Sequence, residues 1–442
     1  MVSSSSSAVH SQKLSTVVPG AVTGDEVVHE LGNMDLVMKQ HYLRGVYLFK
    51  GSDAIEGLGI IALKEPMFAM LNVFYPVAGR IRRSESGRPF IRCNDSGVRI
   101  IEAKCDKTID EWLLESQTEQ YYSLDFQLVT DKVLGPDLPF SPSVYIQFTR
   151  FKCGGMAIGF SWAHVLGDAV SATTCINLWG QLLSKKKTPA QAEAEAQQVK
   201  DMINKATTKS TPDETPISLP VKQLPPVGDY WLSPSDHPMG TFSFQISSSK
   251  MKDMQLDTSF EVLSALIWKC LASIREGSRE PHLVTICRSS SSNSEKKPGV
   301  LSNDQMITSV HCESSLSKIG ISELAELIDK ERVDQKKQIE DLVDSETGEP
   351  NFILYGANLT FVDLEQVDFY GLEINGQKPV HVNFKIDGVG SEGVVLVLPG
   401  TKKNINNASG DGEAAGRMVT VMLPEDEISK LKEVLKIEWN IV

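Results

Sequence analysis

Large and small apolar residues alternate along MAIGFSWAH, residues 156–164. Met156, Ile158, Phe160 and Trp162 occupy one register, and alanine, glycine and serine occupy the other. A period of two residues predicts a buried β-strand. The strand would end at His164, and Leu166 and Gly167 would form the turn that follows. Apolar residues then recur at helical spacing from position 170 to 183, which predicts a helix after the turn.

The second half of the chain begins with a strand-like run, GTFSFQIS, and continues with a core-facing helix over 260–275, FEVLSALIWKCLASIR. A helical stretch follows at about 321–343. Several strands come next, among them GVVLVLP (393–399) and RMVTVMLP (417–424), and a last helix begins near residue 425. Strands and helices mix without a regular β-α-β repeat. The pattern therefore predicts a layered α/β fold and not a doubly wound one.

Residues 184–240 interrupt this apolar pattern with a segment rich in Lys, Thr, Ala, Gln and Pro. Such a composition is typical of an exposed connection between domains. We therefore expect an N-terminal domain over 1–183, a crossover over 184–240 and a C-terminal domain over 241–442.

Composition narrows the function classes. The chain of 442 residues has 57 acidic and 44 basic side chains and a net charge of −13, which argues against nucleic-acid binding. Its seven cysteines include no CxxC pair, so neither a zinc site nor another metal site is predicted. No run of about 18 apolar residues and no signal peptide is evident, and this predicts a cytoplasmic protein without a membrane span.

The segment GVGSEG, residues 388–393, matches the G-x-G-x-x-G pattern of dinucleotide-binding loops. Such a loop must lead into a helix whose amides hold the pyrophosphate. Here VVLVLP follows, which has the character of a strand. We expect a hairpin turn, and a dinucleotide-dependent oxidoreductase remains the weakest of three function hypotheses.

His164 and Asp168 are the candidate site residues. Asp168 precedes the predicted helix and is well placed to cap it, which is a sufficient structural role. His164 lies at the end of a buried strand, where a general base with a pKa near 6 to 7 could face a cleft. A core histidine with satisfied hydrogen bonds is the alternative that the local pattern leaves open.

His164 to Asp168, HVLGD, resembles the HxxxD region of the plant BAHD acyl-CoA-dependent acyltransferases. Further matching segments keep the family's order: FYPVAGRI (74–81), CNDSGVRIIEA (93–103), SFEVLSALIWKC (259–270) and ICR (286–288). The resemblance implies two chloramphenicol-acetyltransferase-like domains that enclose a channel. It implies His164 as the base, acyl-CoA as co-substrate without another cofactor, and Asp168 ion-paired with Arg288.

Two segments depart from the family pattern. Ala169 stands where glycine usually follows the aspartate, which puts the backbone geometry of the loop in doubt. The family's DFGWG signature falls on Glu373, Ile374, Asn375, Gly376 and Gln377, where almost every position has changed. This second departure puts the CoA channel and the closure of the domains in doubt.

Other segments, among them MDLVMKQHYLRGVY (34–47) and YGANLTFVDL (355–364), resemble the eceriferum/glossy clade of this family. That clade acts in cuticular wax formation and promotes extension of very-long-chain acyl-CoAs with the condensing enzyme of the elongase, a 3-ketoacyl-CoA synthase. The resemblance implies a monomer that reaches the endoplasmic reticulum through this partner, and the nucleus stays open as a second location. An elongase accessory protein and an active acyltransferase are therefore the two leading hypotheses.

Overall fold

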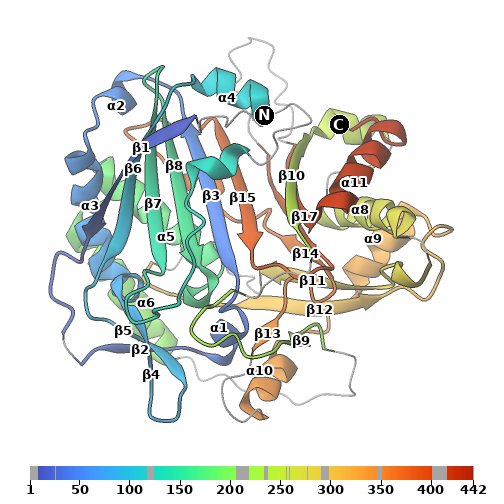
Figure 1. The fold of residues 1–442 in the computed structure, drawn as a ribbon, viewed down its shortest axis with the longest axis horizontal. Coiled ribbons are helices and arrows are strands. Elements are labelled where there is room, and N and C mark those ends of the chain that lie inside the picture. The colour runs from blue at the N-terminus through green and yellow to red at the C-terminus, as the bar shows by residue number, and fades with distance from the viewer. Residues whose placement is uncertain are drawn as a thin grey trace, which may run out of the picture.

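The computed structural model describes residues 8–24, 26–116, 124–205, 219–232, 237–254, 256–257, 259–275, 277–289, 298–345, 351–400 and 416–441. Two six-stranded sheets dominate it (Figure 1). The first has the order β1 (Val9–Val17), β6 (Val98–Cys105), β7 (Val144–Phe151), β8 (Met156–Ala163), β3 (Tyr42–Phe49) and β15 (His381–Asp387). The second has the order β10 (Met239–Ile246), β17 (Arg417–Pro424), β16 (Val394–Pro399), β14 (Leu359–Asp363), β11 (Leu283–Ser289) and β12 (Gln305–His311).

Helices pack against both sheets, as the layered α/β prediction requires, and Figure 1 shows the two halves side by side. With the first sheet lie α1 (Asn33–Val37), α2 (Asp53–Glu56), α3 (Ile60–Val73), α4 (Ile109–Ser116), α5 (Ala169–Leu183) and α6 (Pro189–Lys205). The second half holds α7 (Ser248–Asp253), α8 (Phe260–Ile274), α9 (Ile321–Lys330), α10 (Lys336–Ser345) and α11 (Glu425–Ile437). Short strands complete the fold: β2 (Val28–Glu30), β4 (Arg80–Arg83), β5 (Pro89–Arg92), β9 (Lys222–Gln223) and β13 (Phe352–Ile353).

The apolar patterns that predicted β8, α5 and α8 are confirmed because each segment buries the stripe that defined it. The bulky residues of β8 are all at most 1% exposed. Trp179 of α5 packs on Phe148 of β7, with ring centroids 5.7 Å apart. The apolar stripe of α8 lies in a second core cluster with the inner residues of β10, β16 and β17.

Strand β15 comes from the second half of the chain but closes the first sheet. It pairs antiparallel with β3, from His381 opposite Leu48 to Asp387 opposite Tyr42. Asn383 on β15 also accepts hydrogen bonds from Ser243 of β10 (3.3 Å) and Thr420 of β17 (3.1 Å) in the second sheet. The predicted division at residue 241 is therefore incomplete, because a period-two pattern cannot show which sheet a strand joins.

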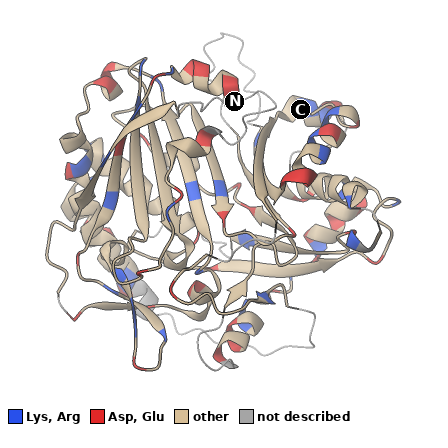
Figure 2. Cartoon of the chain, in the orientation of Figure 1, with Lys and Arg blue, Asp and Glu red and all other residues tan. Residues whose placement is uncertain are grey.

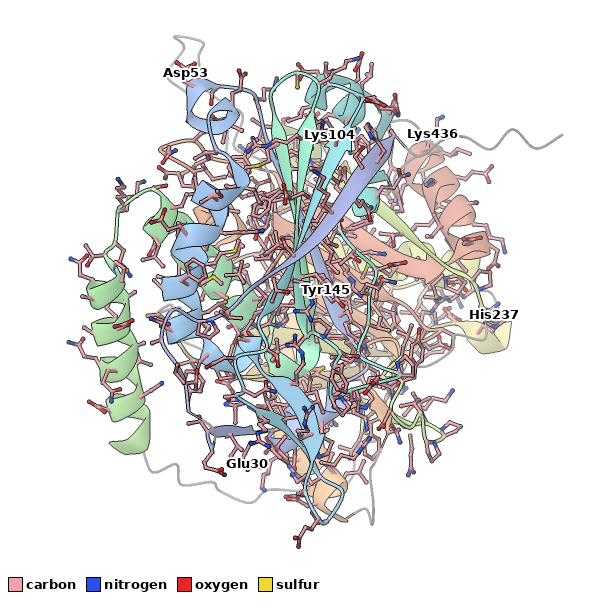
Figure 3. All side chains as sticks on the ribbon, turned by 60° about the vertical axis from the view of Figure 1, so that its left-hand side comes forward. Glu30, Asp53, Lys104, Tyr145, His237 and Lys436 are labelled. Atoms are coloured by element: carbon pink, nitrogen blue, oxygen red, sulfur yellow. The ribbon has the colours of Figure 1, made fainter. Side chains whose placement is uncertain are left out.

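The crossover is more ordered than its polar composition suggested. Helix α6 spans Pro189–Lys205 and forms an outer layer against α3 (Figure 3). Ala192 and Ala196 are buried at 1% and 4% exposure, and alanine has the highest helix propensity. The prediction of a wholly exposed connection is therefore wrong for this part of the crossover, while residues 206–218 lie outside the described residues.

The helical stretch predicted over 321–343 is broken in the middle. Helix α9 ends at Lys330 and α10 begins at Lys336. Between them, Gln335 donates its amide to the carbonyl of Ile307 (2.8 Å), and the Asp334 carboxylate accepts the Ile307 amide (3.0 Å). These bonds to β12 replace the bonds of a continuous helix.

The GVGSEG segment connects β15 to β16 and is not a hairpin. The two strands belong to different sheets, so the loop carries the chain from the first sheet to the second. Its glycines permit close packing: a Cβ on Gly388 would lie 2.0 Å from the carbonyl oxygen of Gln40, and one on Gly390 would lie 2.4 Å from that of Gly356. The strand after the loop gives no helix N-terminus for a pyrophosphate.

Charged side chains lie mainly on helices and loops, while the strands are mostly uncharged (Figure 2). Arg44 is an exception on β3: it is fully buried and ion-paired with Asp387 of β15 at 2.9 Å. Across the described ranges, each helix is too short or too polar to cross a membrane.

We predict that Gly388→Ala destabilises the protein by more than about 3 kcal/mol, because it combines a φ of +78° with the clash against Gln40. Gly228→Ala is the matched control, since Gly228 has a φ of +61° but no atom within 4 Å of an added Cβ. The control should cost only about 1–2 kcal/mol. Urea unfolding of both variants tests this, and equal losses would contradict the close approach.

Candidate functional site

His164 begins a short 3-10 turn, His164–Leu166, directly after β8. Its amide donates to the carbonyl of His41 (2.9 Å), and its carbonyl accepts from the side-chain amide of Asn303 (2.9 Å). The side chain lies deep in the protein, and the residue is 2% exposed. Segments from both halves of the chain thus hold the backbone of this histidine.

Asp168 caps α5, as its position in the sequence predicted. Its Oδ1 accepts from the amides of Val170 and Ser171, both at 3.0 Å. Its own amide donates to the carbonyl of Ser302 (2.9 Å). Burial raises the pKa of Asp168 to about 6, against the opposing effect of these hydrogen bonds.

Ala169 does not disturb the loop, although a glycine is usual there. It is the first residue of α5, and the left-handed conformation falls on Gly167, with φ of +145°. An added Cβ at Gly167 would lie 2.9 Å from the Ser302 amide nitrogen. The turn therefore requires glycine at position 167, and position 169 accepts alanine.

The imidazole of His164 belongs to a buried aromatic cluster. The Tyr355 hydroxyl lies 3.3 Å from Nε2 of His164 and donates to Oε1 of Gln305 at 2.9 Å. The His41 ring lies 4.8 Å from the Tyr355 ring and 6.4 Å from the His164 ring, centroid to centroid. The cluster joins β3, the end of β8, β12 and the segment before β14.

Both imidazoles of the cluster are neutral at physiological pH. Burial lowers the pKa of His164 to about 4. Burial, helped by the neighbouring His164, lowers the pKa of His41 to about 3. Both values lie below the pKa of 6 to 7 expected for a general base that faces a cleft, because protein encloses the two imidazoles.

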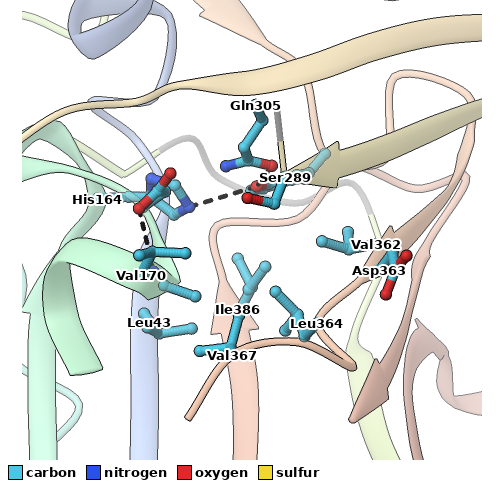
Figure 4. Close-up of a pocket in the computed structure, with 13 residues that line it drawn as sticks. Leu43, His164, Val170, Ser289, Gln305, Val362, Asp363, Leu364, Val367 and Ile386 are labelled. Carbon is cyan, nitrogen blue, oxygen red and sulfur yellow. Dashed lines mark hydrogen bonds between the residues drawn. The ribbon is translucent and has the colours of Figure 1, made fainter. Parts of the chain in front are cut away.

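The space beside His164 is small. The cavity there has about 20 Å³, which is room for about one water molecule. Aliphatic side chains close it opposite the imidazole, among them Leu43, Val362 and Ile386 (Figure 4). A long acyl chain does not fit this space.

A second cavity of about 260 Å³ adjoins the first and is more polar. The two share the lining residues Val170, Ser289, Asp363 and Val367. Arg288, Thr173 and Asn177 line the outer part. The predicted channel between the domains thus corresponds to this pair of unequal cavities.

Arg288 does not pair with Asp168 as the family resemblance implied. Its Nη2 donates to Glu261 (3.1 Å) and to the carbonyl of Ile328 (3.1 Å), while Nε and Nη1 are buried without a partner among the described residues. The amides at the start of α5 satisfy Asp168 instead. The support that we assigned to Arg288 therefore comes from Ser302 and Asn303.

The altered signature, Glu373 to Gln377, forms a tight turn that fastens distant segments. Ile374 and Gln377 exchange two backbone hydrogen bonds of 2.9 Å, and Asn375 and Gly376 have positive φ. Such an Asn-Gly pair suits a type I′ turn. The Gln377 side chain donates to the carbonyl of Lys50 (2.8 Å), and the Asn375 amide donates to Ser184 after α5 (2.8 Å).

Sequence patterns did not identify Tyr355, Gln305, Asn303 or His41 as site residues. They come from three segments far from His164 in the sequence, and no spacing along the chain connects them with it. A polar cluster, SNDQ at 302–305, directly before a strand was the one visible signal. Among the described residues, no three His, Cys, Asp or Glu side chains are grouped so that they could hold a metal ion.

Comparison with known proteins identifies relatives over nearly the whole chain. The model of the Transferase family matches residues 8–436. Protein ECERIFERUM 26-like from Arabidopsis thaliana is 38% identical over 97% of this chain and 95% of its own, and ECERIFERUM 2 from the same plant is 39% identical over 97% and 98%. Hydroxycinnamoyltransferase from Narcissus pseudonarcissus is 34% identical over 34% of each chain.

Solved structures show the same fold. Vinorine synthase aligns with a TM-score of 0.67 at 16% identity, covering 97% of this chain and 98% of its own. TRI101 of F. graminearum, solved with ethyl coenzyme A, has a TM-score of 0.67 at 14% identity and coverage of 94% and 98%. The expected two-domain acyltransferase-like architecture is thereby confirmed.

We predict that Asp168→Asn, which keeps a capping oxygen, removes a pH dependence of stability. The folded pKa near 6 exceeds the ordinary 3.8, so between about pH 4 and 6 the folded protein retains a proton that the unfolded chain has lost. The stability of the wild type therefore falls as pH rises through this window. From pH 4 to 7, the free energy of unfolding of the wild type should therefore fall by up to about 3 kcal/mol relative to that of the variant.

Urea unfolding of both proteins at a series of pH values measures this difference. Taking the difference cancels the titration of His41 and His164, which has the opposite sign. A constant difference between the two proteins across the window would show that Asp168 is ionised throughout.

Proposed function

The chain belongs to the Transferase family of BAHD acyltransferases, and we propose that it acts in very-long-chain fatty acid elongation as a partner of a condensing enzyme. Its similarity to two ECERIFERUM proteins over nearly the full length supports a role in the wax pathway. In this proposal the chain changes which acyl length the elongase accepts, at the endoplasmic reticulum and through its partner. The His164 imidazole is then not a catalyst.

The narrow space beside His164 is the observation that carries the non-catalytic part of this proposal. A cavity of about 20 Å³ beside His164 holds about one water and not an acceptor alcohol or amine. The pKa of His164 is also about 4, so its imidazole is a weak base near neutral pH. A general base is most effective when its pKa lies near the working pH.

An active acyltransferase is the second candidate. His164 is neutral and can accept a proton, and the cavity of about 260 Å³ adjoins the small cavity that His164 lines. In such a reaction, Nε2 would take the proton of an acceptor hydroxyl or amine while that atom attacks an acyl-CoA thioester. Acyl-CoA is the co-substrate in this candidate, and no further cofactor is needed.

We predict that His164→Ala leaves the elongation role intact. The variant and the wild type are each co-expressed with a very-long-chain 3-ketoacyl-CoA synthase in a host that has an elongase, and the acyl chains are profiled. The wild type should lengthen the products, and the variant should match it within about threefold, whereas loss of a working general base costs about 10²–10⁴-fold.

His311→Ala is the matched control, because His311 is exposed at the end of β12. Thermal unfolding of each variant establishes that it is folded. A folded His164→Ala protein that no longer lengthens the products would favour the transferase. Unchanged profiles with the wild type would overturn the elongation role itself.

A further inference from the structure

Tyr355 stands where an acceptor would have to bind. A general base must lie within about 2.6–3.2 Å of the atom whose proton it removes. The Tyr355 oxygen lies 3.3 Å from Nε2 of His164 and 2.9 Å from Oε1 of Gln305. The hydroxyl donates its proton to Gln305, and its oxygen covers the imidazole nitrogen that would act as base.

The Tyr355 side chain is fixed from several sides. The residue is 1% exposed, and its ring packs against His41 and, at 5.4 Å between centroids, against His164. Its amide donates to Nε2 of His41 (3.4 Å), and its carbonyl accepts from the amide of Gly390 (2.9 Å). These contacts hold the phenol against Nε2 of His164.

The neighbouring backbone fixes the same position. Gly356 has a φ of +84°, and a Cβ there would lie 2.5 Å from the carbonyl oxygen of Gly390. Gly388 packs still more closely on Gln40, next to His41, since a Cβ there would lie 2.0 Å from the Gln40 carbonyl oxygen. The GVGSEG loop therefore packs against the neighbours of both His41 and Tyr355, so the backbone of Tyr355 cannot shift without the connection between the two sheets.

We propose that Tyr355 is a built-in occupant of the acceptor position, and that it excludes external hydroxyls and amines from His164. The inference rests on the part of the proposed function in which His164 is not a catalyst, and it does not require the elongase partner. Tyr355 is thus a specificity-determining residue that separates this chain from a working transferase site.

Vacating the position should expose a hydrolytic activity toward acyl-CoA. Tyr355→Phe removes one oxygen and leaves a place for a water molecule beside Nε2. The water oxygen attacks the thioester carbonyl carbon while Nε2 takes a proton from the water. The carbon–sulfur bond then breaks and the sulfur leaves with that proton, which gives a carboxylic acid and the free CoA thiol.

The first experiment measures thiol release from acetyl-CoA, whose acyl group is short, by the purified full-length protein. Release by Tyr355→Phe should exceed that of the wild type by at least about 10²-fold, the lower end of a general base's contribution. Adding His164→Ala to this variant should abolish the gain. Tyr47→Phe is the matched control: Tyr47 is fully buried, and its hydroxyl has no partner among the described residues.

The second experiment needs no CoA site. Tyr355→Ala opens the space of a whole ring, and His164 should then react with diethyl pyrocarbonate at least tenfold faster than in the wild type, as mapped by mass spectrometry. Exposed His311 serves as the internal reference in each protein. Circular dichroism and thermal unfolding verify that both Tyr355 variants are folded.

Two results would overturn the inference. Unchanged protection of His164 in a folded Tyr355→Ala protein would show that Tyr355 does not cover it. Faster reaction of His164 without thiol release from either variant would refute the chemistry assigned to the vacated position. Neither result bears on the elongation assay, so failure of the proposed function would be recognised separately.

Discussion

The pairing of β15 with β3 is the constraint on which the site depends. It puts a strand from the second half of the chain at the edge of the first sheet. Buried polar contacts hold it there: Arg44 with Asp387, and Asn383 with Ser243 and Thr420. Because unpaired buried polar groups are costly, these contacts fix how one sheet meets the other. The residues around His164 owe their positions to that junction.

The site is consequently an interdomain cluster and not a feature of the HxxxD segment alone. His164 comes from the first half, whereas Tyr355, Gln305 and Asn303 come from the second. The GVGSEG loop leaves β15 and packs behind Tyr355. The GVGSEG sequence matches the pattern of a nucleotide-binding loop, but here it has a packing role. Its glycines allow two backbone segments to approach closely.

Local features were predictable from sequence because their causes are local. The alternation before His164 defined β8, and an aspartate before an apolar helical stripe defined the cap of α5. The partner of β15, the neighbours of Arg288 and the position of Tyr355 depend on contacts between residues far apart in the chain. The depressed pKa of His164 has the same origin, because burial arises only when the second half closes over the histidine.

The backbone contacts of His164 explain how the residue can persist without catalysis. Its amide and carbonyl bind His41 and Asn303, and the turn that follows leads into the Asp168 cap. These bonds join segments of both halves and depend on the conformation of the turn more than on the imidazole. The HVLGD segment therefore has a structural role in the fold that does not depend on catalysis. The presence of this motif therefore indicates the fold of the family. Whether an acceptor can reach Nε2 of His164 depends on which atom lies next to that nitrogen.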